Sequence, residues 1–277
     1  MSDYLRGLTS FVPRLIVERA NRGAALVSSP TEQSIMAGVL FADVAGFTAL
    51  TEDLARRGAQ GAEDLTRILN LYFGELIDIV IGHGGDIAKF AGDAVVALWP
   101  ATDTADLAQA VRRIAECSLD LQTSLHAREV VPGRRLTMKL SIGAGPVLLR
   151  HVGGVFDRWE AMLSGDALGQ VAVANQHAAP GDIVAARPAV ARLAGAALGE
   201  ARPDGCLRLL SLLGEALPPA DPAPLQPKPE IAPALRAYLP GAIRARVDAG
   251  QSDWLGELRR VSVVFVTLDG FDVVTPL

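Results

Sequence analysis

Two aspartates stand where they could share a divalent cation. Asp43 ends the apolar run 38–42, which is typical of a buried central strand. Asp93 lies in the turn of a hairpin predicted further along the chain. If that hairpin pairs beside the strand, both carboxylates reach one edge of the sheet, where like charges repel unless a cation lies between them. The pattern therefore predicts a site for a hard cation such as Mg²⁺ or Mn²⁺.

The segment after Asp43 has the residue types of a phosphate site. Gly46 permits a close approach of the backbone to a ligand. A helix over 48–57, with Thr48 as its N-cap, would direct free amide groups and a positive dipole end toward the same place. Each aspartate also has a simpler interpretation, because aspartate is common at helix caps and in turns. Nucleotide chemistry is indicated by the two aspartates taken together with the glycine and the helix start that follow Asp43.

The elements that must position these residues follow from apolar periodicity and from turn residues. The sequence predicts a strand over 38–43, a long amphipathic helix over 62–81, and a hairpin with arms 87–90 and 94–99. Asp103 is suited to cap a third helix, and two strands are expected around Gly145-Pro146. Shorter strands and helices follow. This order predicts an α+β sandwich, a mixed sheet covered by helices, over residues 31–215.

The segments on either side of this domain lack its regular alternation of strands and helices. Residues 1–30 form an N-terminal leader, and residues 216–260 form a linker with helices in which seven prolines fall within 218–233. The run 263–271 then repeats 39–47, with Val, Phe, Gly and Phe in matching places. Residues 261–277 are therefore expected to be the truncated start of a second copy of the domain. In that copy Thr267 stands where the first copy has Asp43.

Composition narrows the function classes. The chain has 277 residues, of which half are hydrophobic, and 26 basic against 31 acidic residues give a net charge of −5. This balance disfavours a nucleic-acid partner, and the hydrophobic content disfavours disorder. The sequence contains no run of about 18 apolar residues, so no membrane span is expected. Cys117 and Cys206 read as reduced core thiols, which is typical of a cytoplasmic protein.

Two motifs together resemble those of the class III nucleotidyl cyclases. They are Phe41-Ala-Asp-Val-Ala-Gly-Phe-Thr48 and Gly85-Asp-Ile-Ala-Lys-Phe-Ala-Gly-Asp93. The variety that fits best is the soluble, bicarbonate-responsive adenylyl cyclase with tandem domains, and the likeness extends to 13–17 and 254–266. The resemblance implies the ferredoxin-like sandwich of that family. It also implies conversion of ATP to 3′,5′-cyclic AMP and pyrophosphate.

The resemblance further implies roles for individual residues. Asp43 and Asp93, with the Val44 carbonyl, would bind two Mg²⁺ or Mn²⁺ ions, and the ribose 3′-hydroxyl would attack the α-phosphorus of ATP. The phosphates would lie against the backbone of Val44, Ala45, Gly46, Phe47 and Thr48. The catalytic aspartates are thus also the metal ligands.

Other family positions are replaced in this chain. The transition-state Asn and Arg positions fall at Gly169 and Val173, and the base-recognising partner falls at Met162. The chain is therefore expected to supply the metal-binding half of a site. A second cyclase domain, in cis or in a dimer partner, would complete that site, and the chain alone would turn over little or nothing. The alternative is a catalytically silent regulatory module of the same fold that binds nucleotide or a partner domain.

Two further interpretations concern the residues around the hairpin. Lys89 is either an exposed surface lysine or part of a regulatory anion site for bicarbonate, whose arginine position falls at Ala172. Gly84-Gly-Asp86 is shared with diguanylate cyclases, a related fold. The next two residues depart from that signature, so the class III assignment is preferred.

Overall fold

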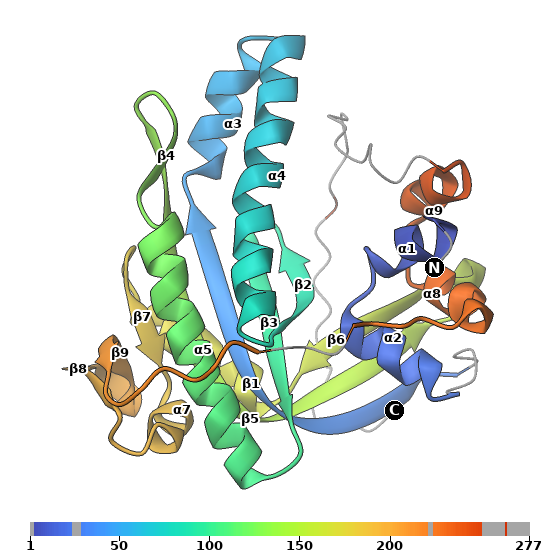
Figure 1. Ribbon diagram of the computed structural model, residues 1–277. Coiled ribbons are helices and arrows are strands. Elements are labelled where there is room, and N and C mark those ends of the chain that lie inside the picture. Colours follow the sequence, from blue (N-terminus) through green and yellow to red (C-terminus); the bar gives the residue numbers. More distant parts are fainter. Residues whose placement is uncertain (1–2, 24–28, 221–223, 251–263, 265–277) are drawn as a thin grey trace.

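The computed structural model describes residues 3–23, 29–220, 224–250 and 264, and within them nine strands form one sheet. The strand order is β2-β3-β1-β5-β7-β9-β8, and β4 and β6 also pair with β5 (Figure 1). Of the strand pairs that the structure describes, only β5 and β7 run parallel, so the sheet is mixed. The strands are β1 (Thr31–Ala45), β2 (Asp86–Ala91), β3 (Ala94–Ala101), β4 (Arg128–Val131), β5 (Arg134–Gly153), β6 (Trp159–Ser164), β7 (Ile183–Ala185), β8 (Ala197–Ala201) and β9 (Leu207–Leu212).

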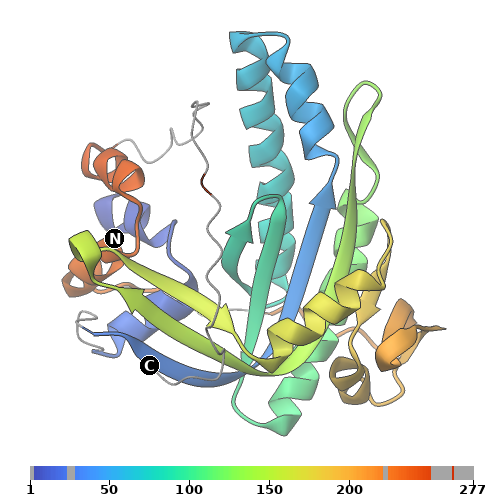
Figure 2. The same ribbon diagram turned by 180° about the vertical axis from the view of Figure 1, so that it is seen from behind.

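Helices cover both faces of this sheet. α4 (Ala59–Gly82) and α5 (Thr104–Leu125) lie on one face, and α6 (Asp166–Gln176) crosses the other, where it is seen from behind in Figure 2. The predicted sandwich of helices on a mixed sheet is confirmed. The remaining helices are α1 (Asp3–Thr9), α2 (Arg14–Asn21), α3 (Phe47–Ala55), α7 (Arg187–Arg192), α8 (Ala232–Ala237) and α9 (Gly241–Asp248).

The alternation of β1 divides the core into two layers. Leu40, Ala42 and Val44 are buried in the large cluster beneath α4 and α5, whereas Val39 is buried in the smaller cluster beneath α6. Because successive side chains point to opposite faces, Asp43 belongs to the α6 face of the sheet. The apolar stripe of α4 fills the larger layer, with these side chains nearly or fully buried: Leu65, Ile68, Tyr72, Leu76 and Val80.

Several expected elements differ in the structure. The two strands predicted around Gly145-Pro146 are one continuous strand, β5, in which Pro146 stands opposite Met36 and is exposed. The hairpin is confirmed as β2 and β3, and Asp103 caps α5 by accepting hydrogen bonds from two backbone amides at 2.8 and 2.9 Å. Strands β4, β6 and β8 were not expected, because their short segments carry little apolar alternation.

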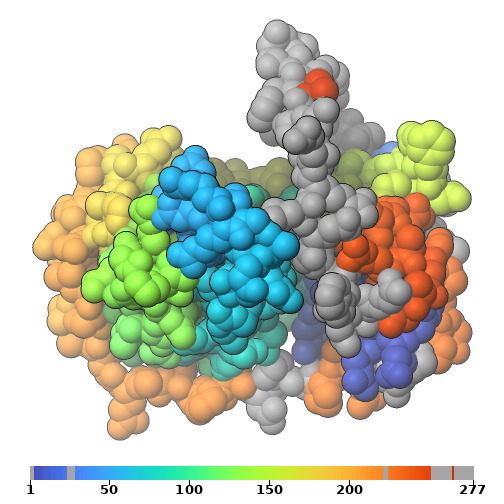
Figure 3. All heavy atoms as spheres, turned by 90° about the horizontal axis from the view of Figure 1, so that it is seen from above, coloured from blue at the N-terminus to red at the C-terminus, as the bar shows by residue number. Residues whose placement is uncertain are grey.

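The leader and the segment after the domain pack together. Residues 3–21 and 229–248, which we call the helical unit, share an apolar cluster that includes Leu8, Val17 and Leu235. Tyr4 donates a hydrogen bond to Asp248 at 3.2 Å across 244 positions of sequence. Figure 3 shows the two segments, dark blue and red-orange, side by side at one side of the molecule.

Among the helices that the structure describes, none is both long and apolar enough to cross a bilayer. The expected start of a second domain, residues 261–277, lies outside the described residues apart from Val264.

Candidate metal and nucleotide site

Strand register brings the two predicted aspartates to one edge of the sheet. Asp43 stands opposite Ala94 in the antiparallel pair of β1 and β3. Asp93 immediately precedes Ala94 in the turn between β2 and β3. Since directly opposite Cα atoms lie about 5 Å apart, the backbones of Asp43 and Asp93 are neighbours. The Asp43 carboxylate is about a quarter exposed and Asp93 is exposed, so both are open to a ligand.

A lysine that the sequence analysis missed lies beside Asp43. Lys139 of β5 stands directly opposite Asp43 in the β1–β5 ladder, and its Nζ lies 3.1 Å from Asp43 Oδ2. Its strand neighbours Met138 and Leu140 are fully buried under α4 and α5, so Lys139 points to the α6 face with Asp43. The alternation of apolar and polar residues over 136–142 indicates that Lys139 points away from the large core cluster. Only the β1–β5 register reveals which acid the lysine meets.

The loop after β1 leads into a helix start. Gly46 has φ +108°, and a Cβ at this position would lie 2.9 Å from the Arg135 carbonyl oxygen, so the turn requires glycine. The helix α3 begins at Phe47, with Gly46 as its N-cap. The expectation that Thr48 caps the helix was therefore wrong, because Thr48 is the second residue of the helix.

The start of α3 is fixed by aromatic packing. Phe47 stacks on Phe73 of α4 with ring centroids 5.5 Å apart and meets Tyr72 edge-on at 6.1 Å. Ala45 and Thr48 remain exposed on either side of this buried ring. The first amide groups of a helix have no partner within it. The predicted phosphate segment Val44–Thr48 thus presents an anchored helix start next to Asp43.

Lys89 already has an acidic partner within the chain. Its Nζ lies 3.3 Å from Glu160 Oε1 of β6, and Arg158 bonds the other oxygen of Glu160 at 2.9 Å. Burial raises the pKa of Glu160, but the bonds from Arg158 and Lys89 outweigh it, and the pKa is lowered overall. Any added anion would compete with Glu160 for Lys89. Ala172, at the expected arginine position, has no charge to offer.

The replaced family positions lie on β6 and α6. Met162 of β6 and Val173 of α6 are 48% and 37% exposed, and Gly169 lies one helical turn before Val173. None of the three side chains can donate a hydrogen bond. In this chain α6 and β6 therefore contribute no polar group at these positions.

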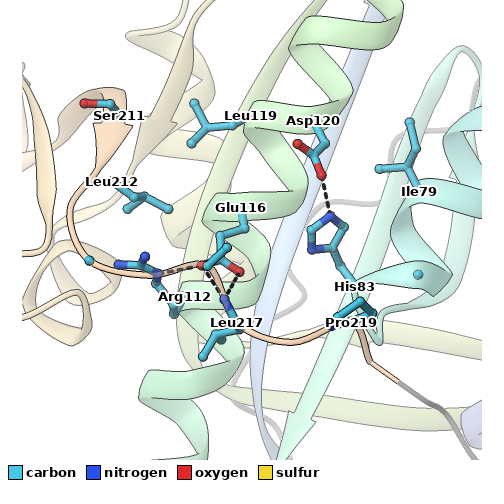
Figure 4. A pocket seen from close by; sticks show the side chains of 13 residues that line it. Ile79, His83, Arg112, Glu116, Leu119, Asp120, Ser211, Leu212, Leu217 and Pro219 are labelled. Carbon is cyan, nitrogen blue, oxygen red and sulfur yellow. Dashed lines mark hydrogen bonds and ion pairs between the residues drawn. The ribbon is translucent and has the colours of Figure 1, made fainter.

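A separate cavity of about 780 Å³ lies on the other side of the sheet, between α4, α5 and the strap 211–219 (Figure 4). Its polar side chains bond one another: Arg112 reaches Glu116 at 2.8 Å, and His83 reaches Asp120 at 2.8 Å. Glu116 also accepts the Leu217 amide at 3.2 Å. None of the predicted site residues lines this cavity.

The donor set near Asp43 suits a cation that is also held by its substrate. In the described part of the chain, groups of three or more acidic, histidine or cysteine side chains that could hold a metal are absent. Two carboxylates alone fit Mg²⁺ and Mn²⁺, which are commonly bound through one or two carboxylates together with substrate phosphates and water. The β1–β3 ladder ends at Asp43 whereas β1–β5 pairing continues to Ala45, so the Val44 backbone extends past β3 at the same edge.

Comparison with known proteins adds family information. Residues 29–196 match the family described as the adenylate and guanylate cyclase catalytic domain. Adenylate cyclase type 10 of Rattus norvegicus is 35% identical over 161 residues, which is 56% of this chain and 10% of that protein. The Homo sapiens protein of the same name is 28% identical over 263 residues, which is 83% of this chain. This chain spans only 16% of the length of the human protein.

Solved structures show the same fold. The adenylyl cyclase CyaB from P. aeruginosa is 21% identical with a TM-score of 0.51, covering 68% of this chain and all of its own. The guanylate cyclase domain of RhGC from Catenaria anguillulae, solved in complex with GTP, is 16% identical with a TM-score of 0.53. It covers 66% of this chain and all of its own.

Proposed function

Because the chain belongs to the adenylate and guanylate cyclase catalytic domain family, we propose that it supplies the metal-binding half of an adenylyl cyclase. The reaction is the conversion of ATP to 3′,5′-cyclic AMP and pyrophosphate. Similarity to proteins named adenylate cyclase type 10 supports ATP as the substrate. The observation that carries the proposal is the register that sets Asp43 beside Ala94, and so beside Asp93.

The chain's own residues have distinct tasks in this proposal. Asp43 and Asp93 hold two Mg²⁺ or Mn²⁺ ions, with the Val44 carbonyl as a further ligand. When bound, such ions lower the pKa of a coordinated hydroxyl and neutralise phosphate charge. The amide groups from Ala45 to Thr48 orient the terminal phosphates at the start of α3. These contacts bind and align the triphosphate for in-line displacement of pyrophosphate.

Lys139 adds a cation at the same place. In the structure it neutralises Asp43, which removes much of the repulsion between the two carboxylates. If Asp43 held a divalent ion instead, the Lys139 ammonium group would be free to pair with another anion. We propose that Lys139 exchanges its carboxylate partner for a phosphate oxygen when nucleotide binds.

The other half of the site must come from elsewhere. Gly169, Val173 and Met162 cannot stabilise a pentavalent phosphorus or recognise a base through side-chain hydrogen bonds. A second cyclase domain, in cis or in a dimer partner, would supply those groups across the α6 face. The same three residues favour the alternative function, a silent module that binds nucleotide or a partner domain without turnover.

Cyclic AMP formation with Mn²⁺ or Mg²⁺ tests the proposal. It is measured for the chain alone and after mixing with a complete class III cyclase domain that lacks its own metal aspartates. We expect the mixture to be active and Asp43→Ala and Asp93→Ala to abolish that activity, whereas Asp120→Ala, remote on α5, should not. Activity that survives both substitutions would remove the metal assignment. Nucleotide binding without turnover in every mixture would favour the silent module.

A further inference from the structure

A partly buried contact joins the helical unit to the strand that leads to Asp93. Asp86, the first residue of β2, accepts the backbone amides of Arg14 at 3.1 Å and Leu15 at 2.9 Å. These are the first two residues of α2, whose amides have no acceptor within their own helix. The Asp86 carboxylate therefore caps a helix that lies 71 positions away in sequence.

The cap is the kind of contact that fixes both partners. A carboxylate that accepts two backbone amides at a helix start combines charge-assisted hydrogen bonds with a favourable dipole. Burial raises the pKa of Asp86, and the hydrogen bonds from the two amides oppose that shift. Moving α2 away would leave two amides and a carboxylate to find new partners, which is costly when the groups are buried.

β2 depends on such contacts because it is an edge strand. Among the described strands it pairs only with β3, and the β2–β3 register shifts between Ile87 and Lys89. The shift sets Asp86 opposite Leu98 and Lys89 opposite Val96, so both charged side chains share one face of the sheet. Without this bulge, residues three apart would point to opposite faces. The bulge thus directs Asp86 toward α2 and Lys89 toward Glu160.

Two routes lead from β2 to the candidate site. The first is covalent: β2 ends at Ala91, and Asp93 follows in the turn. The second is a row of aromatic rings, in which Phe90 meets Phe73 edge-on at 5.5 Å and Phe73 stacks on Phe47, the first residue of α3. A shift of β2 along its edge would therefore move the metal ligand and the phosphate segment together.

We propose that Asp86 is a positioning residue through which docking of the helical unit sets the geometry of the Asp43–Asp93 site. With α2 capped, β2 is held in register and the site binds its cation. With α2 released, β2 and its turn loosen and affinity for the cation falls. The inference rests on the proposed function for the identity of that site. The leader and the segment after the domain thereby act on the catalytic half from outside it.

The test uses the full chain and two measurements, one of which needs no metal. Hydrogen exchange is followed in α2 and in residues 86–94, and free Mn²⁺ is titrated by electron paramagnetic resonance. We expect Asp86→Ala to speed exchange in both segments and to raise the Mn²⁺ Kd roughly three- to tenfold, less than the loss typical of residues that contact a metal ligand directly. Asp86→Asn should give exchange rates and a Mn²⁺ Kd between those of the wild type and Asp86→Ala, because asparagine has one side-chain oxygen where aspartate has two. Asp120→Ala, which removes an exposed carboxylate of equal charge, should change neither.

The outcomes separate this inference from the proposed function. Faster exchange in α2 with unchanged exchange in 86–94 and unchanged Mn²⁺ binding would overturn it, as would unchanged exchange in α2. If Asp86→Ala does not fold, as judged by circular dichroism, Asp86→Asn decides by the same criteria. If Asp93→Ala leaves Mn²⁺ binding intact, the metal assignment fails instead. The exchange of residues 86–94 then still reports whether the helical unit holds the hairpin.

Discussion

Acidification should lower the free energy of unfolding through His151, a residue that contacts the helical unit. This β5 side chain is fully buried, and its Nδ1 lies 2.6 Å from the Tyr238 hydroxyl just after α8. Its Nε2 has no hydrogen-bond partner among the described residues. Burial, and secondarily the charge of Arg19, lowers the pKa of His151 from 6.5 to about 4. The folded chain therefore holds a neutral imidazole over a pH range in which the unfolded chain binds a proton.

The sign and size of the change in stability with pH follow from the difference in pKa between the folded and unfolded chain. A depressed pKa contributes stability that is present above pH 6.5 and is lost as pH falls through about 4. Since one pKa unit corresponds to about 1.4 kcal/mol, the loss between pH 7 and pH 5 is about 2 kcal/mol. Carboxyl groups with shifted pKa values, such as those of Asp86 and Glu160, also contribute to the pH dependence. The decisive quantity is thus the difference between the wild type and a variant that lacks this imidazole.

Urea unfolding at pH 7 and pH 5 measures this difference. His151→Phe removes the titrating group and keeps a ring in the same space, so its stability should fall by about 2 kcal/mol less than that of the wild type. Tyr238→Phe removes the hydrogen bond but leaves His151 buried, and should keep the wild-type pH dependence. An equal fall in the wild type and His151→Phe would refute the reasoning.

Three further predictions concern single contacts. Lys139→Met removes the ammonium group 3.1 Å from Asp43. Mn²⁺ alone should then bind more tightly, whereas a non-hydrolysable ATP analogue should bind more weakly. Equal changes of both affinities in the same direction would contradict the proposed exchange. Gly46→Ala forces a side chain into φ +108° and against the Arg135 carbonyl, and should destabilise the fold by about 1–3 kcal/mol in urea. Gly23→Ala, at φ +82° and with no atom of the described residues within 4 Å of the added Cβ, is its control and should cost less. Asp103→Ala removes the cap of α5 and should cost about 1 kcal/mol by thermal unfolding.

Local patterns in the sequence predicted the parts of the fold that local contacts stabilise. The β2–β3 hairpin follows from its turn residues, and α4 follows from an apolar stripe that is buried in the structure. Asp103 was recognised as a cap because its side chain bonds amides only two and three residues away. Thr48 was misjudged as a cap, since glycine at 46 ends the strand in a conformation that few other residues adopt.

Contacts between distant segments could not be read in the same way. The pair of Lys139 and Asp43 depends on the register of β1 against β5, which many other residues set together. The cap of α2 by Asp86 depends on where the leader docks. The leader and the segment after the domain each show an apolar face. The sequence of neither segment predicts that the other segment will pack against its apolar face.

The helical unit ties the fold to the order in which the chain is made. Its first helices leave the ribosome more than two hundred residues before α8 and α9, which cover the same apolar cluster. At ordinary rates of synthesis this interval is roughly 10 to 50 s. During that time α1 and α2 expose side chains such as Leu8 and Val17, which are completely covered in the finished molecule. Until α8 and α9 emerge and cover the shared cluster, the nascent leader exposes a short apolar segment of the kind to which chaperones bind.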